Sequence, residues 1–192
     1  LADATNFTDS ILISQNASTG TLSSASNNTG VGDTAFASLT SGNDNAGFGF
    51  KALTLNTTGS DAVAVGAFSL QRNTTGSNNV AIGYDSLGNN TTADNNVAIG
   101  KEALQANTTG TSNVAVGHNA LLTSSTRLGN TAVGFNAAKV TDTTGIVAVG
   151  YKAMEANTTG YDAVAVGASS LLSNTTGHSN TAIGFNVNAL KP

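Results

Sequence analysis

A short motif recurs along almost the whole chain: a β-branched residue, alanine, another β-branched residue and then glycine. The glycine that ends it stands at Gly32, Gly49, Gly66, Gly83, Gly100, Gly117, Gly134, Gly150, Gly167 and Gly184. Eight of the nine steps between these glycines are 17 residues long, and the step from Gly134 to Gly150 is 16. A fixed period of this kind is typical of a repeat architecture, in which each unit buries its apolar surface against the next.

Within each repeat, side chains alternate in a way that predicts a short β-strand. Val80 and Ile82 share one side of the strand, and Ala81 and Gly83 share the other. A helix is disfavoured because every repeat contains a glycine and a stretch rich in threonine. We expect the side that carries valine and isoleucine to face the core, together with Leu87, the apolar residue four positions after the glycine.

Each repeat also contains a corner sequence, Asn-Thr-Thr-Gly, whose asparagine and glycine tolerate left-handed backbone. It occurs at residues 56–59, 73–76, 107–110, 157–160 and 174–177, with a near copy at 90–93. Two short strands and two corners per repeat predict an all-β fold, a parallel β-solenoid of about 17 residues per coil. We expect residues 28–192 to form an array of ten coils, and residues 1–27 to form an irregular lead-in or cap with one degenerate coil at residues 9–14. The missing residue between Gly134 and Gly150 predicts a tightened corner or a local kink.

The alanine and glycine side of the strands is the candidate for assembly. Small side chains allow another chain to approach closely, and a lone rod would expose the strip to water. The expected assembly is a parallel homotrimer. Its candidate interface residues are Ala81, Gly83, Ala98, Gly100, Ala115, Gly117, Ala165 and Gly167.

The position after the repeat glycine varies, and in several coils it is aromatic. Because aspartate, lysine and histidine also occur there, we expect it to face solvent. The aromatic members form a candidate surface contact stripe for a receptor or a glycan; the alternative is that they shield the corner of a neighbouring chain. They are Phe50, Tyr84, Phe135, Tyr151 and Phe185.

Composition excludes several classes of function. Only 9% of residues are charged and the net charge is −4 without a basic cluster, so nucleic acid is not an expected partner. No apolar run reaches the ~20 residues of a membrane span. The two histidines, His118 and His178, stand in different coils, which does not suit a metal or acid–base site. We therefore predict no enzyme activity, no catalytic or metal residues and no cofactor.

Two further patterns have a structural and a functional interpretation. The Asn-Thr-Thr runs are formal N-glycosylation acceptors, although their periodic recurrence favours a structural corner. Their threonines could alternatively match an ice lattice, which makes an ice-binding solenoid the alternative function. Asp44, Asp61 and Asp162 share one corner position and are expected to be solvated.

The repeated Asn-x-Ala-x-Gly core, as in residues 96–100 and 113–117, resembles the head repeats of trimeric autotransporter adhesins of the YadA-like type. The longer unit in residues 96–110 is similar to repeats of phage tail fibres. The period of this chain is longer than that of the adhesin heads. The resemblance implies a left-handed parallel β-roll with three chains to a head, located outside the cell, at a cell surface or in a virion tail fibre. The expected function is that of a structural and adhesive fibre segment that supports attachment to a host-surface receptor or glycan.

Overall fold

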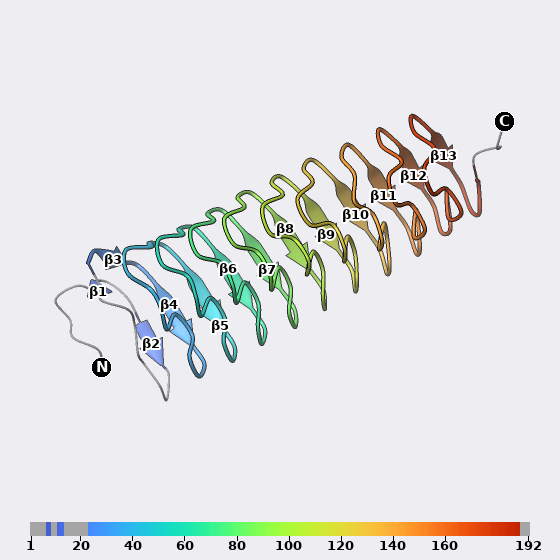
Figure 1. The fold of residues 1–192 in the computed structure, drawn as a ribbon. Helices are drawn as coiled ribbons and strands as arrows, with labels where there is room; N and C mark the ends of the chain where they lie inside the picture. Colours follow the sequence, from blue (N-terminus) through green and yellow to red (C-terminus); the bar gives the residue numbers. More distant parts are fainter. Residues whose placement is uncertain (1–6, 9–10, 14–22, 189–192) are drawn as a thin grey trace.

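The computed structural model describes residues 7–8, 11–13 and 23–188, and within them the protein is an elongated rod of stacked coils (Figure 1). All its regular elements are short strands: β1 (Phe7–Thr8), β2 (Ile11–Ile13), β3 (Ala25–Ser26), β4 (Thr29–Val31), β5 (Ala46–Phe48), β6 (Val63–Val65), β7 (Val80–Ile82), β8 (Val97–Ile99), β9 (Val114–Val116), β10 (Thr131–Val133), β11 (Val147–Val149), β12 (Val164–Val166) and β13 (Thr181–Ile183).

Eleven of these strands form one parallel sheet that runs the length of the rod. The order is β2, then β4 to β13 in sequence order, and each strand pairs in parallel with the strand of the next coil. Equivalent residues lie opposite one another, for example Ala81 with Ala98 and Ile82 with Ile99. The predicted parallel β-solenoid of about 17 residues per coil is therefore confirmed. Strand β2 lies within the expected degenerate coil and pairs with β4, while the other residues of 9–14 are outside the described part of the chain.

The prediction of which side of the strand faces the core was wrong. Ala81 is fully buried, whereas Ile82 is 38% exposed and Val80 is half-buried. The same inversion holds along the sheet from β6 to β13, where the central alanine of each strand is buried. The alternation itself is correct, but the valines and isoleucines point outward.

Alanine fits the interior because the coil is narrow and its opposite wall supplies the larger side chain. Leu70, Leu87, Leu104 and Leu121, each four residues after a repeat glycine, are fully buried, as predicted for Leu87. Each of these leucines has a left-handed backbone, with φ between 46° and 51°. A large residue on the strand as well would overfill the space between the two walls.

In the described repeats from β4 to β13, each coil has only one strand, where the sequence predicted two. The segment after each repeat glycine instead takes positive φ at its second and fourth residues, as at Glu102 (58°) and Leu104 (50°). Its amides still bond between coils: the Leu87 N–H donates to the Ala103 carbonyl and the Glu102 N–H to the Tyr84 carbonyl. The backbone groups of this second wall of the coil thus form hydrogen bonds between coils, although the segment is not a strand.

In the first coils the interior is also filled by one large and one small side chain, but the residues differ. Phe36 takes the place of the buried leucine, and the strand positions facing it are Gly30 and Gly47 instead of alanine. A Cβ added to Gly30 would lie 2.7 Å from Cδ2 of Phe36. The phenyl ring therefore fills the space that an alanine methyl group occupies elsewhere.

This exchange of volume predicts a coupling between Gly30 and Phe36. We expect Gly30→Ala to destabilise the wild-type chain more than it destabilises the Phe36→Leu variant, with an interaction free energy of about 1–2 kcal/mol. Chemical denaturation of the two single variants and the double variant measures it. Strictly additive effects would show that the two positions do not share one volume.

The 16-residue coil keeps the sheet intact and changes one corner. Thr131 of β10 pairs with Val147 of β11, so the strand register continues across the missing residue. A single residue, Asp142, lies between Thr141 and Thr143, where the regular corner has two threonines. The shortening is therefore confined to a tightened corner, as expected.

Candidate functional site

The outward side of the sheet is an uncharged, mainly apolar surface that runs along the described part of the rod. From β4 to β13, each strand contributes its first and third residues to this surface, which we call the sheet face. These residues are Thr29, Val31, Ala46, Phe48, Val63, Val65, Val80, Ile82, Val97, Ile99, Val114, Val116, Thr131, Val133, Val147, Val149, Val164, Val166, Thr181 and Ile183. None is charged, and none is buried. An apolar strip of this length is a candidate interaction surface.

A row of aromatic side chains borders the sheet face on the side that follows the repeat glycine. The predicted stripe residues Phe50, Tyr84, Phe135 and Tyr151 are between 42% and 53% exposed, and Phe185 is 80% exposed. The exposure expected for this position is therefore found at these five residues. Whether they contact a receptor stays a prediction.

The rings of this row use much of their surface on one another. His118, Phe135 and Tyr151 stack with neighbouring centroids 5.4 and 5.5 Å apart and with nearly parallel planes. At the other end, Phe50 and Tyr84 each meet Phe68 edge to face. Sequence reasoning missed Phe68, which stands two residues after its repeat glycine. The position directly after that glycine is alanine in this coil, and this could have indicated that the neighbouring phenylalanine takes the place of the aromatic residue.

Lysine side chains cover further ring surface. The ammonium of Lys51 lies 5.2 Å from the centroid of Phe50 and 5.9 Å from that of Phe68. Lys101 approaches Tyr84, and Lys152 approaches Tyr151. Because ring faces are occupied by neighbouring rings and ammonium groups, the row favours a role in stabilising the border over a role as an open platform for sugar rings.

The predicted trimer interface needs correction for its alanines. Ala81, Ala98, Ala115 and Ala165 are fully buried inside a single chain, so they cannot contact another chain. The repeat glycines are half-buried, and the space beside their Cα atoms is taken by the next coil: a Cβ on Gly100 would lie 2.5 Å from the carbonyl oxygen of Gly117. Small residues at these positions serve stacking within the chain. Contacts of Gly83, Gly100, Gly117 and Gly167 with another chain stay a prediction.

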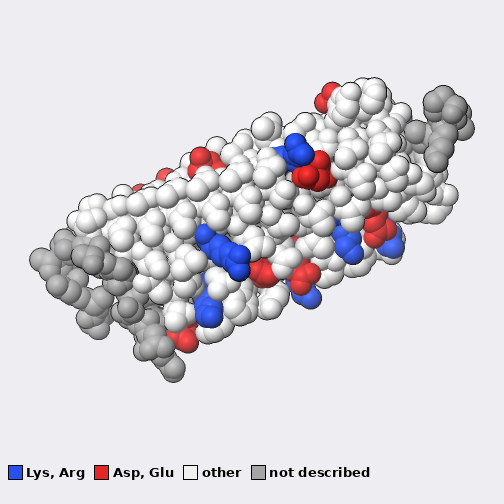
Figure 2. All heavy atoms as spheres, viewed as in Figure 1, with Lys and Arg blue, Asp and Glu red and all other residues white. Residues whose placement is uncertain are grey.

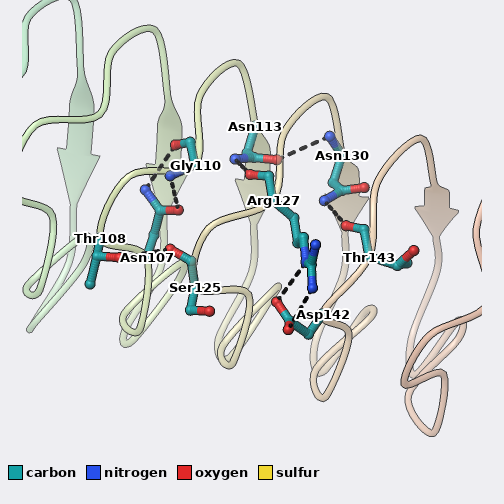
Figure 3. A network of polar contacts seen from close by, with 9 residues as sticks. All are labelled: Asn107, Thr108, Gly110, Asn113, Ser125, Arg127, Asn130, Asp142 and Thr143. Carbon is teal, nitrogen blue, oxygen red and sulfur yellow. Dashed lines mark hydrogen bonds and ion pairs between the residues drawn. The ribbon is translucent and has the colours of Figure 1, made fainter.

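Two rows of buried asparagines hold the corners together (Figure 3). The Asn107 Nδ2 donates to the carbonyl of Gly110 at 3.0 Å, and the Gly110 N–H donates back to Asn107 Oδ1. Near the strands, the Asn130 N–H donates to Asn113 Oδ1, and Asn130 Nδ2 donates to the Thr143 carbonyl. The first row includes the glycosylation acceptors, and Asn56, Asn73, Asn90, Asn107 and Asn157 are fully buried. The folded chain therefore offers no access to these five acceptors.

The tightened corner carries an ion pair that its regular counterparts lack. Arg127 Nε lies 3.3 Å from Asp142 Oδ1, and both side chains are nearly half-exposed (Figure 3). An exposed pair of this kind contributes at most about 1 kcal/mol. We interpret this ion pair as a local contact that stabilises the shortened corner.

Charged groups are sparse over the surface. The view in Figure 2 shows a few acidic and basic groups, several of them side by side, with wide uncharged areas between them. Among the described residues, there is no group of three or more histidine, cysteine, aspartate or glutamate side chains that could hold a metal ion. His118 stacks on Phe135, and His178 stacks on Tyr161 in a different coil. No helix suited to crossing a membrane occurs in the described ranges.

No family model, curated protein or solved structure matches the chain.

Proposed function

We propose that this chain is a structural and adhesive segment of an extracellular fibre at a cell surface or in a virion tail, in which three parallel copies of left-handed coils pack around a common axis. The fibre holds attachment groups away from the surface that carries it and supports binding to a host receptor or glycan. The proposal places the sheet face, instead of the buried alanines, between the chains.

The sheet face is the observation that carries this proposal. It is uniform along the rod, whereas a catalytic or small-ligand site would be local. Eight of its large apolar residues, from β4 to β13, are 36% to 71% exposed, so the strip is open to a partner along its whole length. A partner of the same length and repeat is required to cover it, and a parallel copy of the chain meets this requirement.

A charged residue in the middle of the sheet face should disperse the assembly. We expect Ile99→Glu to convert the oligomer to a folded monomer, because a carboxylate buried between chains has no partner there. Sedimentation velocity measures the assembly, and circular dichroism verifies that the coils remain. The matched control is Thr109→Glu, which places the same charge at an exposed corner and should leave the oligomer unchanged. An Ile99→Glu variant that assembles like the wild type would contradict the proposed interface.

An ice-binding solenoid is the second candidate, favoured by one observation. The second threonine of the corner is exposed at Thr58, Thr75, Thr92 and Thr109, which gives one outward hydroxyl per coil. The first threonine is otherwise engaged: the Thr74 hydroxyl donates to the Thr91 carbonyl at 2.9 Å. Thermal hysteresis of the protein at micromolar concentration would support this candidate. Its absence would contradict ice binding and leave the fibre segment as the proposed function.

A further inference from the structure

The sheet face departs from its repeated pattern at one strand. Along β4 to β13 its residues are valine, isoleucine or threonine, apart from Ala46 and Phe48, which both belong to β5. The smallest and the largest side chain of the face therefore stand on the same strand, two residues apart. Since the strands run across the rod, as Figure 1 shows, these two side chains lie at the same height along it.

Ala46 is the short member of its row, the row of first strand residues. Its parallel neighbours are Thr29 of β4 and Val63 of β6, so a methyl group lies between two longer, branched side chains. Ala46 is half-buried. Above this residue the sheet face has room for a side chain that is larger than those of the other rungs.

Phe48 is the long member of its row, the row of third strand residues. Its neighbours in the sheet are Val31 and Val65, both shorter than the phenyl ring, and Phe48 is 39% exposed. Among the described residues, no other aromatic ring and no lysine ammonium packs on it, in contrast to the rings of the aromatic row. Its ring therefore has surface left for a partner.

Rotational symmetry brings the two rows together. In a parallel assembly of this kind the contact is head to tail around the axis, so the row of third residues of one copy meets the row of first residues of its neighbour. We propose that Phe48 of each copy packs over Ala46 of the neighbouring copy, and that this contact sets the register of the chains. This inference rests on the proposed self-association and specifies where the copies touch.

Only equal heights satisfy both residues. A shift of one coil moves Phe48 from Ala46 to a threonine or a valine, where a branched side chain takes the space of the ring. The same shift leaves Ala46 facing a valine. The first contact is then overfilled and the second underfilled, and both changes weaken packing. The uniform residues of the other strands tolerate such a shift, so the β5 contact distinguishes one register from the next.

The borders of β5 carry opposite charges at this same height. Asp44 lies two residues before the strand and is exposed, and Lys51 lies three residues after it, with its ammonium 5.2 Å from the centroid of the Phe50 ring. Within the described part of the chain, neither charge belongs to an ion pair. In the proposed contact, Lys51 of one copy lies on the side of Asp44 of its neighbour, which favours the same register.

A size-swap cycle tests the packing. Phe48→Ala puts two alanines at every contact and Ala46→Phe puts two rings there, so each should raise the apparent dissociation constant of the oligomer about tenfold or more. The double variant Ala46→Phe/Phe48→Ala again places a ring against an alanine and should return to within about threefold of the wild type. The matched control, Phe48→Ala/Val63→Phe, puts the ring and the alanine on neighbouring strands and should stay as weak as Phe48→Ala. Sedimentation velocity measures assembly, and circular dichroism verifies that the coils remain.

Disulfide formation gives an independent readout, because the chain contains no cysteine. When Ala46→Cys chains are mixed with Phe48→Cys chains and oxidised, the mixture should yield linked pairs with one chain of each kind. Ala46→Cys mixed with Ile82→Cys is the register control. Ile82 belongs to the same row as Phe48 but lies two coils further along the rod, about 10 Å away, which is beyond the reach of a disulfide.

The outcomes separate the register from the self-association. An oligomeric wild type whose size-swap double variant is as weak as the single variants would overturn the packing of Phe48 on Ala46. Equal cross-linking in the two cysteine mixtures would overturn the register. Either result leaves the proposed self-association in place, whereas a monomeric wild type would overturn it as well.

Discussion

Replacing Gly83 with alanine should cost about 3 kcal/mol or more of stability and split the rod. Gly83 has a φ of 135°, and a Cβ added to it would lie 2.5 Å from the carbonyl oxygen and 2.6 Å from the carbonyl carbon of Gly100. Both atoms belong to the backbone of the next coil. That coil cannot move away, because the Gly100 N–H donates to the Ile82 carbonyl at 2.7 Å. Chemical denaturation followed by circular dichroism measures the loss.

Gly76→Ala is the matched control for this prediction. A Cβ on Gly76 would also approach the next coil, at 2.3 Å from the Ala93 carbonyl oxygen, but Gly76 does not have a positive φ. Ala93 carries a methyl group at the equivalent corner one coil later, which shows that this corner accommodates it. We expect a clearly smaller loss than for Gly83→Ala. Equal losses would show that the positive φ is not what requires glycine in the motif.

Asn96→Asp should produce the second large effect, about 3–5 kcal/mol at neutral pH. Asn96 is fully buried, and its Nδ2 donates to the carbonyls of Gly110 and Asp94, while its Oδ1 accepts from the backbone N–H of Asn113. A carboxylate of the same shape loses the donors and faces carbonyl oxygens instead. The exposed neighbour provides the control: Asn95→Asp should be nearly neutral, because aspartate occurs at the same corner in other coils.

The effect of Asn96→Asp should depend on pH in a defined direction. Burial raises the pKa of an aspartate above its value of about 3.9 in the unfolded chain. The folded variant then binds its proton more tightly than the unfolded one, so the destabilisation is smallest below about pH 4 and grows as pH rises through the folded-state pKa. Denaturation curves between about pH 4 and pH 8 test this. A destabilisation independent of pH would mean that the buried charge is not its cause.

The period in the sequence was sufficient to predict the stacked coils, but the alternation could not tell which side of the strand is inside. Neighbouring side chains such as Ala81 and Ile82 show that the strand has two faces, but they do not show which face lies inside the coil. The variation among coils contained the missing information. From β6 to β13 the central residue is always alanine, as a confined space requires, whereas the flanking positions also accept Thr131 and Thr181.

The second wall of the coil could not be predicted from strand patterns, because it contains no strand. Every second residue of this segment has a left-handed backbone, as at Lys51 and Leu53. Lysine and leucine normally prefer negative φ, so their identity gives no indication of this conformation. Hydrogen bonds between neighbouring coils impose the conformation. The candidate interface alanines were assigned to the wrong face because alternation alone does not tell which side of the strand is inside. The exposed aromatic position was predictable because it tolerates Lys101 and His118.

The mass of the wild-type protein in solution tests the central claim most directly, because a single chain leaves the sheet face uncovered. One chain has a mass of 19.0 kDa. Light scattering coupled to size-exclusion chromatography at micromolar concentration should give about three times that mass, with no change on moderate dilution. A monodisperse species of one chain mass under the same conditions would contradict the trimer and the fibre that depends on it.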